Sequence, residues 1–333
     1  MKIKNLFKIL LFPFLLFVLF EIFLHAFKPS VYEYSKTLGW EVKKNYKKKF
    51  SFVDYYDQTY DGIYETNEYG ARQIGDLRAD IKILAIGDSF TMDPHTGNET
   101  SWFGVLKDGL EKKYKKSFLV SAIGGGGYGT NQQYLFTKKF LKESKLKPDI
   151  VILQFCVNDF MNNSYLWETN TENYNQFLRR PFFYQNNHYF YQESLIGKIF
   201  RTEFLSKFKT PNYFFLILSI IKQKYFLNEI NKNILDNSIN ITQYLLIKLK
   251  NLFKAKNIYA FNCKDTSSYP EIGWISVLDS SGYKVLKNPS SNLKKLSLNE
   301  KIFFRDGGHY NELGNKIIGD AILEEITKYK IFN

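Results

Sequence analysis

Cysteine is scarce in this sequence of 333 residues, which has only Cys156 and Cys263. Neither belongs to a C-x-x-C pair or to a Cys/His cluster with metal-ligand spacing, so we expect no metal site. Each thiol ends or lies within an expected buried strand. A disulfide would require those two strands to be adjacent, and we expect two free, buried thiols instead.

Nucleic-acid-binding motifs are also lacking, although the formal net charge is +13. The lysines are scattered, and the densest run, at residues 43–49, lies shortly after an apolar N-terminus. No zinc-finger, RNA-recognition or basic-zipper pattern accompanies this run. We therefore expect a solvated or membrane-proximal basic segment and no nucleic-acid partner.

The N-terminus has no small-x-small cleavage site after its apolar run. Three lysines precede residues 9–27, which are apolar apart from Glu21 and His25. This pattern favours an uncleaved signal anchor within residues 1–27, which would cross a membrane once and place the rest of the chain outside the cytoplasm. A cleaved signal peptide and a buried soluble helix are the alternatives.

The remainder divides into a polar linker and N-terminal extension at 28–80 and a regular domain at 81–333. Strands and helices alternate in the domain, which predicts a parallel sheet with helices on both faces. Residues 160–235 interrupt the alternation as an insertion whose apolar patch, 213–221, is too short to be a second span. The expected strands cover 82–87, 118–122, 150–155 and 258–262, and the expected helices cover 102–114, 131–143, 237–254 and 312–328.

Residues of catalytic type occur in four loops that the expected sheet brings to one edge, because ligands bind at the carboxyl ends of strands in such folds. Ser89 lies in a G-D-S-F loop, a glycine-rich loop covers 124–129, and Asn158 begins an N-D pair. The fourth loop reads D-G-G-H and contains Asp306 and His309. We interpret Asp88 and Asp159, which neighbour Ser89 and Asn158, as residues that shape their loops.

A serine nucleophile needs a base and the base needs an orienting carboxylate, roles that Ser89, His309 and Asp306 fill. The developing oxyanion needs hydrogen-bond donors, for which we select the N–H groups of Ser89 and Gly127 and the side-chain amide of Asn158. Glycine suits position 127, since a side chain there would obstruct the approach of the backbone to the substrate.

These four blocks resemble those of the SGNH, or GDSL, hydrolase family. The resemblance implies a three-layer, flavodoxin-like α/β/α fold, a Ser-His-Asp triad, a three-donor oxyanion hole and no metal or other cofactor. It covers residues 82–159 and 300–328, and the T-N-x-x-G-x-R pattern at 66–72 is similar to a segment of membrane-anchored bacterial members. The chain departs from the family pattern at Cys156, where glycine is usual, and at Ala122, where asparagine is frequent.

Two other histidines compete with His309 for the role of base. His95 lies six residues after Ser89 with Asp93 as the only carboxylate in frame, and we expect His188 to be exposed. The glycine loop also fits a G-x-G-x-x-G dinucleotide fingerprint, but it follows the second strand and lacks the acidic residue further on. A phosphate loop is excluded because no Gly-Lys-Ser/Thr follows.

The sequence thus predicts a serine ester hydrolase acting outside the cytoplasm on O-acyl, most simply acetyl, groups of cell-envelope carbohydrate. Membrane lipid esters are the second substrate class. An O-acyltransferase would use the same triad and covalent intermediate, and a glycan-binding module with decayed catalysis is the third alternative.

Overall fold

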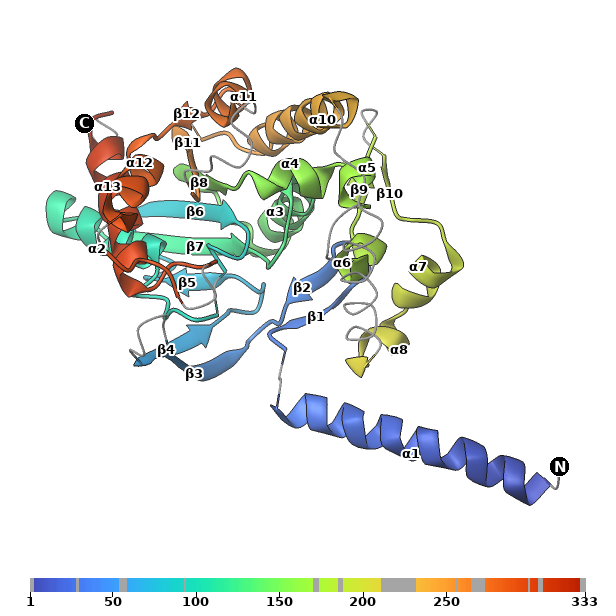
Figure 1. The fold of residues 1–333 in the computed structure, drawn as a ribbon. Coiled ribbons are helices and arrows are strands. Elements are labelled where there is room, and N and C mark those ends of the chain that lie inside the picture. Colours follow the sequence, from blue (N-terminus) through green and yellow to red (C-terminus); the bar gives the residue numbers. More distant parts are fainter. Residues whose placement is uncertain are drawn as a thin grey trace.

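The structure is a computed structural model in which one central sheet is covered by helices and a single N-terminal helix projects from the domain (Figure 1). It describes residues 3–27, 30–53, 59–92, 94–169, 174–184, 188–210, 232–255, 257–264, 273–298, 300–304 and 308–329.

The central sheet has the strand order β12-β11-β8-β6-β7-β5 in the described part of the chain. All neighbours are parallel except β5, which pairs antiparallel with β7 at one edge. Taken in chain order, the parallel strands are arranged 2-1-3-4-5, the flavodoxin-like order. The predicted parallel α/β sheet is therefore confirmed, with one antiparallel edge strand added. The strands are β5 (Arg72–Ile74), β6 (Ile81–Gly87), β7 (Phe118–Gly124), β8 (Ile150–Phe155), β11 (Asn257–Asn262) and β12 (Lys284–Val285).

Helices cover both faces of this sheet (Figure 1). One face packs against α2 (Trp102–Tyr114), α12 (Asn288–Ser297) and α13 (Glu312–Thr327). The other packs against α3 (Thr130–Ser144), α4 (Asn158–Asn163), α10 (Lys232–Lys250) and α11 (Trp274–Ser280). The strands β7 and β8 are buried throughout, which explains why they read as continuous apolar runs.

The N-terminal extension packs on the domain through two antiparallel hairpins and β5. The hairpins are β1 (Tyr32–Ser35) with β2 (Gly39–Val42), and β3 (Lys47–Val53) with β4 (Thr59–Glu65). Between β4 and β5, the Asn67 side-chain oxygen accepts the N–H groups of Tyr69 and Ala71 at 2.9 and 3.0 Å. The T-N-x-x-G-x-R segment thus forms a turn that positions β5 at the edge of the central sheet.

Helix α1 (Ile3–Phe27) projects from the domain, and the C-terminal end of the helix is the end that joins the domain (Figure 1). Its Glu21 carboxylate accepts hydrogen bonds from the backbone N–H groups of Lys209 and Thr210 at 2.5 and 2.8 Å. Within the described residues, no helix has the length and apolarity that crossing a bilayer requires. The predicted signal anchor therefore receives no support from the structure.

The described part of the insertion contains several short elements between β8 and α10. These are α5 (Tyr165–Glu168), α6 (Tyr174–Arg179), β9 (Phe182–Phe183), β10 (Tyr189–Phe190), α7 (Leu195–Phe200) and α8 (Glu203–Ser206). A fully buried ion pair between Arg180 and Glu168, 3.1 Å apart, joins its first part, and the Arg180 guanidinium also donates to Gln132 on α3. The apolar patch at 213–221 lies outside the described residues.

The expectation of two free thiols is wrong, since Cys156 and Cys263 form a disulfide. The reason is the topology: β8 and β11 are neighbours and end in register, with Phe155 opposite Asn262. The next residue of each strand is a cysteine, and their Cα atoms are 5.2 Å apart, within the range of bridged pairs.

Candidate active site

Ser89 lies in the turn that follows β6, beside the point where the strand order reverses between β6 and β8. In open α/β sheets, this switch point is where the ligand crevice forms. The turn is fixed by Asp88, whose buried carboxylate accepts the Phe90 N–H at 2.9 Å and the Gln154 side-chain amide at 3.2 Å. Burial raises the pKa of Asp88, and these hydrogen bonds and nearby His309 offset only part of that rise.

His309 lies against the nucleophile loop from the other end of the chain. Its ring centroid is 5.2 Å from that of Phe90, the residue after Ser89. Its carbonyl accepts the Phe304 N–H at 2.9 Å, and the adjacent Tyr310 is buried and donates its hydroxyl to the Cys263 carbonyl. The structure therefore brings His309 and the Ser89 loop together. Asp306 lies outside the described residues.

The glycine-rich loop follows β7, next to the Ser89 turn in the sheet. Gly127 has φ +70°, so its backbone conformation requires glycine, and a Cβ on it would come within 2.6 Å of the end of the Gln176 side chain on α6. Gly124 is also required, because a Cβ would approach the Gly87 carbonyl to 2.1 Å. In the part of the chain that the structure describes, the N–H groups of Ser89 and Gly127 donate to no protein acceptor.

The β1–β2 hairpin holds the residue just before Gly127. The Gly126 N–H donates to the Tyr32 hydroxyl at 2.7 Å, and the Trp40 indole N–H donates to the Gly126 carbonyl at 3.0 Å. The buried Tyr128 hydroxyl in turn donates to the Trp40 carbonyl at 2.6 Å. Both backbone groups of Gly126 are thus occupied, whereas the N–H of the next residue, Gly127, is not occupied by any acceptor among the described residues.

Asn158 begins α4 directly after β8, so it flanks the switch point opposite Ser89. Its side-chain nitrogen is 3.5 Å from the Asp88 carboxylate, a long contact that a substrate oxygen could replace. The following Asp159 is fully buried and accepts from Thr130 and Gln133, both at 3.3 Å. Burial, with a smaller effect of the Asp88 carboxylate, raises the pKa of Asp159 well above its usual range.

Arg72 supports the loop that continues from Ser89. This fully buried side chain donates to the Asn98 side-chain oxygen at 2.8 Å and to the carbonyls of Thr91 and Thr96 at 3.2 and 2.7 Å. Its guanidinium also lies 5.0 Å from the ring centroid of Phe103 on α2. The edge strand β5 therefore fixes the nucleophile loop to the sheet through one arginine.

His95 lies closer to the site than its position in a polar loop suggests. Its ring is nearly perpendicular to that of His309 with a centroid distance of 5.9 Å, and Phe304 lies 5.7 Å away on its edge. Asp93 lies outside the described residues. His188 is exposed, as predicted.

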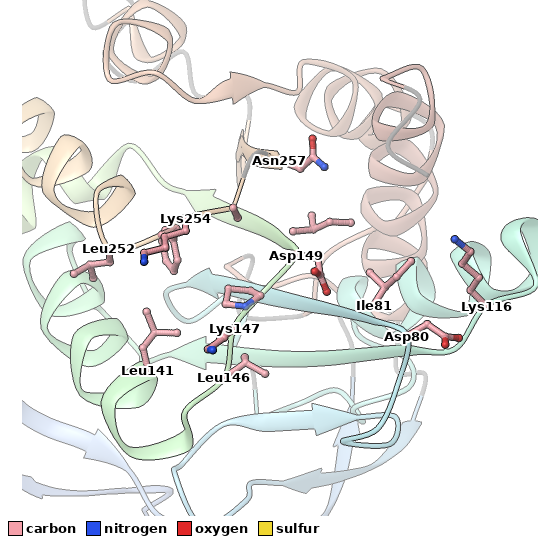
Figure 2. Close-up of a pocket in the computed structure, with 14 residues that line it drawn as sticks. Asp80, Ile81, Lys116, Leu141, Leu146, Lys147, Asp149, Leu252, Lys254 and Asn257 are labelled. Carbon is pink, nitrogen blue, oxygen red and sulfur yellow. The ribbon is translucent and has the colours of Figure 1, made fainter. Parts of the chain in front are cut away.

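A cavity of about 920 Å³ lies at the other end of the parallel strands, where their amino ends meet (Figure 2). Its walls come from the amino ends of β6, β8 and β11 and include Asp80, Asp149 and Lys147. Ser89 follows the carboxyl end of β6, so this cavity is not part of the catalytic arrangement. Among the described residues there is also no cluster of histidine, cysteine or carboxylate side chains able to hold a metal ion.

Comparisons with known proteins agree with the chemistry of these loops. Residues 85–181 match the GDSL-like Lipase/Acylhydrolase family. The match covers the Ser89, Gly127 and Asn158 loops, and it supports a carboxylic ester hydrolase. No functionally curated protein matches the sequence.

Several solved structures are similar over most of their length. A psychrotrophic esterase, EstA, from Pseudoalteromonas sp. is 10% identical with a TM-score of 0.43, covering 75% of this chain and 99% of that one. An acetylxylan esterase, Axe2, from Geobacillus stearothermophilus is 14% identical with a TM-score of 0.41, covering 76% and 95%. A lipase/acylhydrolase from Enterococcus faecalis is 14% identical with a TM-score of 0.41, covering 75% and 96%.

Sequence reasoning missed Arg72, Tyr32 and Trp40, which support the catalytic loops. Arg72 had a signal, because it ends the T-N-x-x-G-x-R segment. Tyr32 and Trp40 had none, since they are aromatic residues in an aromatic-rich extension and reach Gly126 across 94 and 86 residues of chain.

Proposed function

We propose that this protein is a serine-dependent acyl ester hydrolase with Ser89 as nucleophile and His309, oriented by Asp306, as general base. The observation that carries the proposal is the packing of His309 on Phe90, which places an imidazole beside the serine turn although 220 residues separate them. The match of residues 85–181 to an acylhydrolase family supports the same chemistry.

The proposed reaction follows from the positions of these groups. His309 removes the proton of the Ser89 hydroxyl as the serine oxygen attacks the ester carbonyl. The N–H groups of Ser89 and Gly127 and the Asn158 amide then stabilise the oxyanion, each such donor contributing roughly 3–4 kcal/mol in known cases. Protonated His309 gives its proton to the leaving alcohol, and water, activated by the same imidazole, releases the acid from the acyl-enzyme.

We extend the proposal to action outside the cytoplasm on O-acyl groups of cell-envelope carbohydrate. The Cys156–Cys263 disulfide supports this location, because disulfides persist mainly in oxidising compartments. The lysines before the apolar segment of α1 support the same orientation. Apolar side chains between Leu11 and Phe23 that are 39–66% exposed make α1 the candidate for attachment to a membrane.

The activity is tested with p-nitrophenyl acetate and octanoate, the full chain in detergent, and the variants Ser89→Ala and His309→Ala. We expect both variants to lose at least 10³-fold in kcat, whereas the exposed control variants Ser297→Ala and His188→Ala keep it. Wild-type protein that is folded yet cleaves neither ester would contradict the proposal. The preferred acyl length separates deacetylation from lipid hydrolysis.

The location is tested separately by fractionating cells that express the full chain. We expect the protein in the membrane fraction, resistant to alkaline carbonate, with its catalytic domain accessible to protease from the outer side of that membrane. Recovery in the soluble cytoplasmic fraction would contradict this part of the proposal and leave the ester hydrolase unaffected.

A further inference from the structure

A second described cavity, of about 580 Å³, lies where the end of α1 meets the β1–β2 hairpin, α6 and α8. This is within the size range of pockets that bind small ligands. Its lining combines cationic and aromatic side chains, with two carboxylates and one histidine. The main lining residues are Tyr32, Tyr34, Trp40, Lys43, Arg179 and Lys209.

Positive charge dominates this lining. Four cationic side chains, of Lys43, Arg179, Lys207 and Lys209, face two carboxylates, and one of those, Glu203, pairs with Lys207 at 3.3 Å. Burial, followed by repulsion from Lys43, lowers the pKa of Lys209. A bound anion would offset this repulsion and accept charge-assisted hydrogen bonds from the cations.

The aromatic walls favour a sugar as the carrier of that anion. Tyr32 and Tyr34 are half-buried, so their rings are fixed yet accessible, and Trp40 closes the inner side. The Tyr34 hydroxyl is held by donating to the Arg201 carbonyl at 2.6 Å. Fixed rings of this kind pack against the C–H face of a pyranose, while the surrounding cations bind a carboxylate or phosphate on it.

The cavity adjoins the catalytic arrangement through two shared side chains. Tyr32 and Trp40 line it, and the same residues hydrogen-bond both backbone groups of Gly126, next to the proposed oxyanion donor Gly127. A polymer unit bound here would contact the two side chains that hold Gly126, next to the proposed oxyanion donor.

We propose that this cavity is a subsite for an anionic sugar unit of the acylated glycan substrate. The proposal rests on the proposed esterase function, which it deepens by naming the charge of the substrate. It also explains why an N-terminal extension outside the matched residues 85–181 packs onto the catalytic loops.

The test compares acetylated trigalacturonate, which is anionic, with acetylated xylotriose, which is neutral, using the full chain in detergent. We expect wild-type kcat/KM to favour the anionic substrate, and the ratio of the two values to fall at least tenfold in Lys43→Gln/Lys207→Gln. Lys147→Gln, which removes one charge at the opposite cavity (Figure 2), should keep the ratio. Equal ratios in the wild type and the double variant would overturn the proposal.

Direct binding separates this inference from the esterase itself. Calorimetric titration with unacetylated trigalacturonate should give binding that weakens at least tenfold in Lys43→Gln/Lys207→Gln, even if the wild type cleaves no ester. Lysine-dependent binding by a wild-type protein that cleaves no ester would retain the subsite and reject the hydrolase. Lysine-dependent binding to phosphatidylglycerol vesicles without binding of trigalacturonate would reject the sugar subsite and assign the cavity to a lipid headgroup.

Discussion

Loss of the disulfide between Cys156 and Cys263 should destabilise the protein strongly without abolishing its fold. The bridge closes a loop with a sequence separation of 107 residues. In the chain-entropy description, a loop of about 100 residues contributes about 4.7 kcal/mol by restricting the unfolded chain. The six paired residues of β8 and β11 remain when the bridge is absent, so the two strands stay neighbours.

The assay is thermal unfolding of the wild type with and without reductant, beside Cys156→Ser/Cys263→Ser. At roughly 2–4 °C per kcal/mol for a domain of this size, we expect Tm to fall by about 10–20 °C. The double variant should show the lower Tm under both conditions. Two reactive thiols in wild-type protein denatured without reductant, or a Tm that reductant does not change, would refute the reasoning.

Three further predictions concern single side chains. Asn158→Ala should lower kcat about 10²–10³-fold in p-nitrophenyl acetate hydrolysis with little change in KM, and an unchanged kcat would remove Asn158 from the oxyanion hole. Tyr32→Phe deprives the Gly126 N–H of its acceptor and should lower kcat about tenfold, whereas Tyr34→Phe should not; equal kcat values in both variants would contradict a positioning role. Because burial raises the pKa of the Asp159 carboxyl, the folded state binds the carboxyl proton more tightly than the unfolded chain does. The stability that this proton contributes is therefore lost as pH rises through the folded-state pKa. The Tm of Asp159→Asn relative to wild type should therefore increase from pH 5 to pH 8, and a constant difference would show that the carboxyl is not protonated in the fold.

The sequence was sufficient for the elements whose pattern is local. The bounds of α2 and β8 agree with the prediction because an amphipathic helix and a buried apolar strand are each encoded within their own residues. The last helix is also confirmed, and its N-cap Asn311 accepts the Gly314 N–H at 2.9 Å as that residue type predicts.

Contacts between distant segments could not be predicted in the same way. The edge strand β5 has only three residues, too few for a period to show, and its pairing with β7 depends on the turn at Asn67. The disulfide was missed because its formation depends on β8 and β11 being neighbours, a property of topology.

The candidate site also has a part that the sequence predicts and a part that only the structure shows. Ser89, Asn158 and the glycine loop follow consecutive parallel strands, so strand order alone brings them to one edge. Gly127 was selected from the sequence, and the structure adds that Tyr32 and Trp40 occupy both backbone groups of the neighbouring Gly126. The nearness of His95 to His309 likewise depends on a loop fixed by Arg72 and not on any sequence pattern.

The most direct test of the account is covalent labelling with a fluorophosphonate, followed by peptide mass spectrometry. The proposed mechanism predicts one label per chain, on Ser89, and at least 10³-fold slower labelling of His309→Ala because the serine then lacks its base. A label on another residue, or labelling of Ser89 at the same rate without His309, would contradict the assignment of these two residues as nucleophile and base.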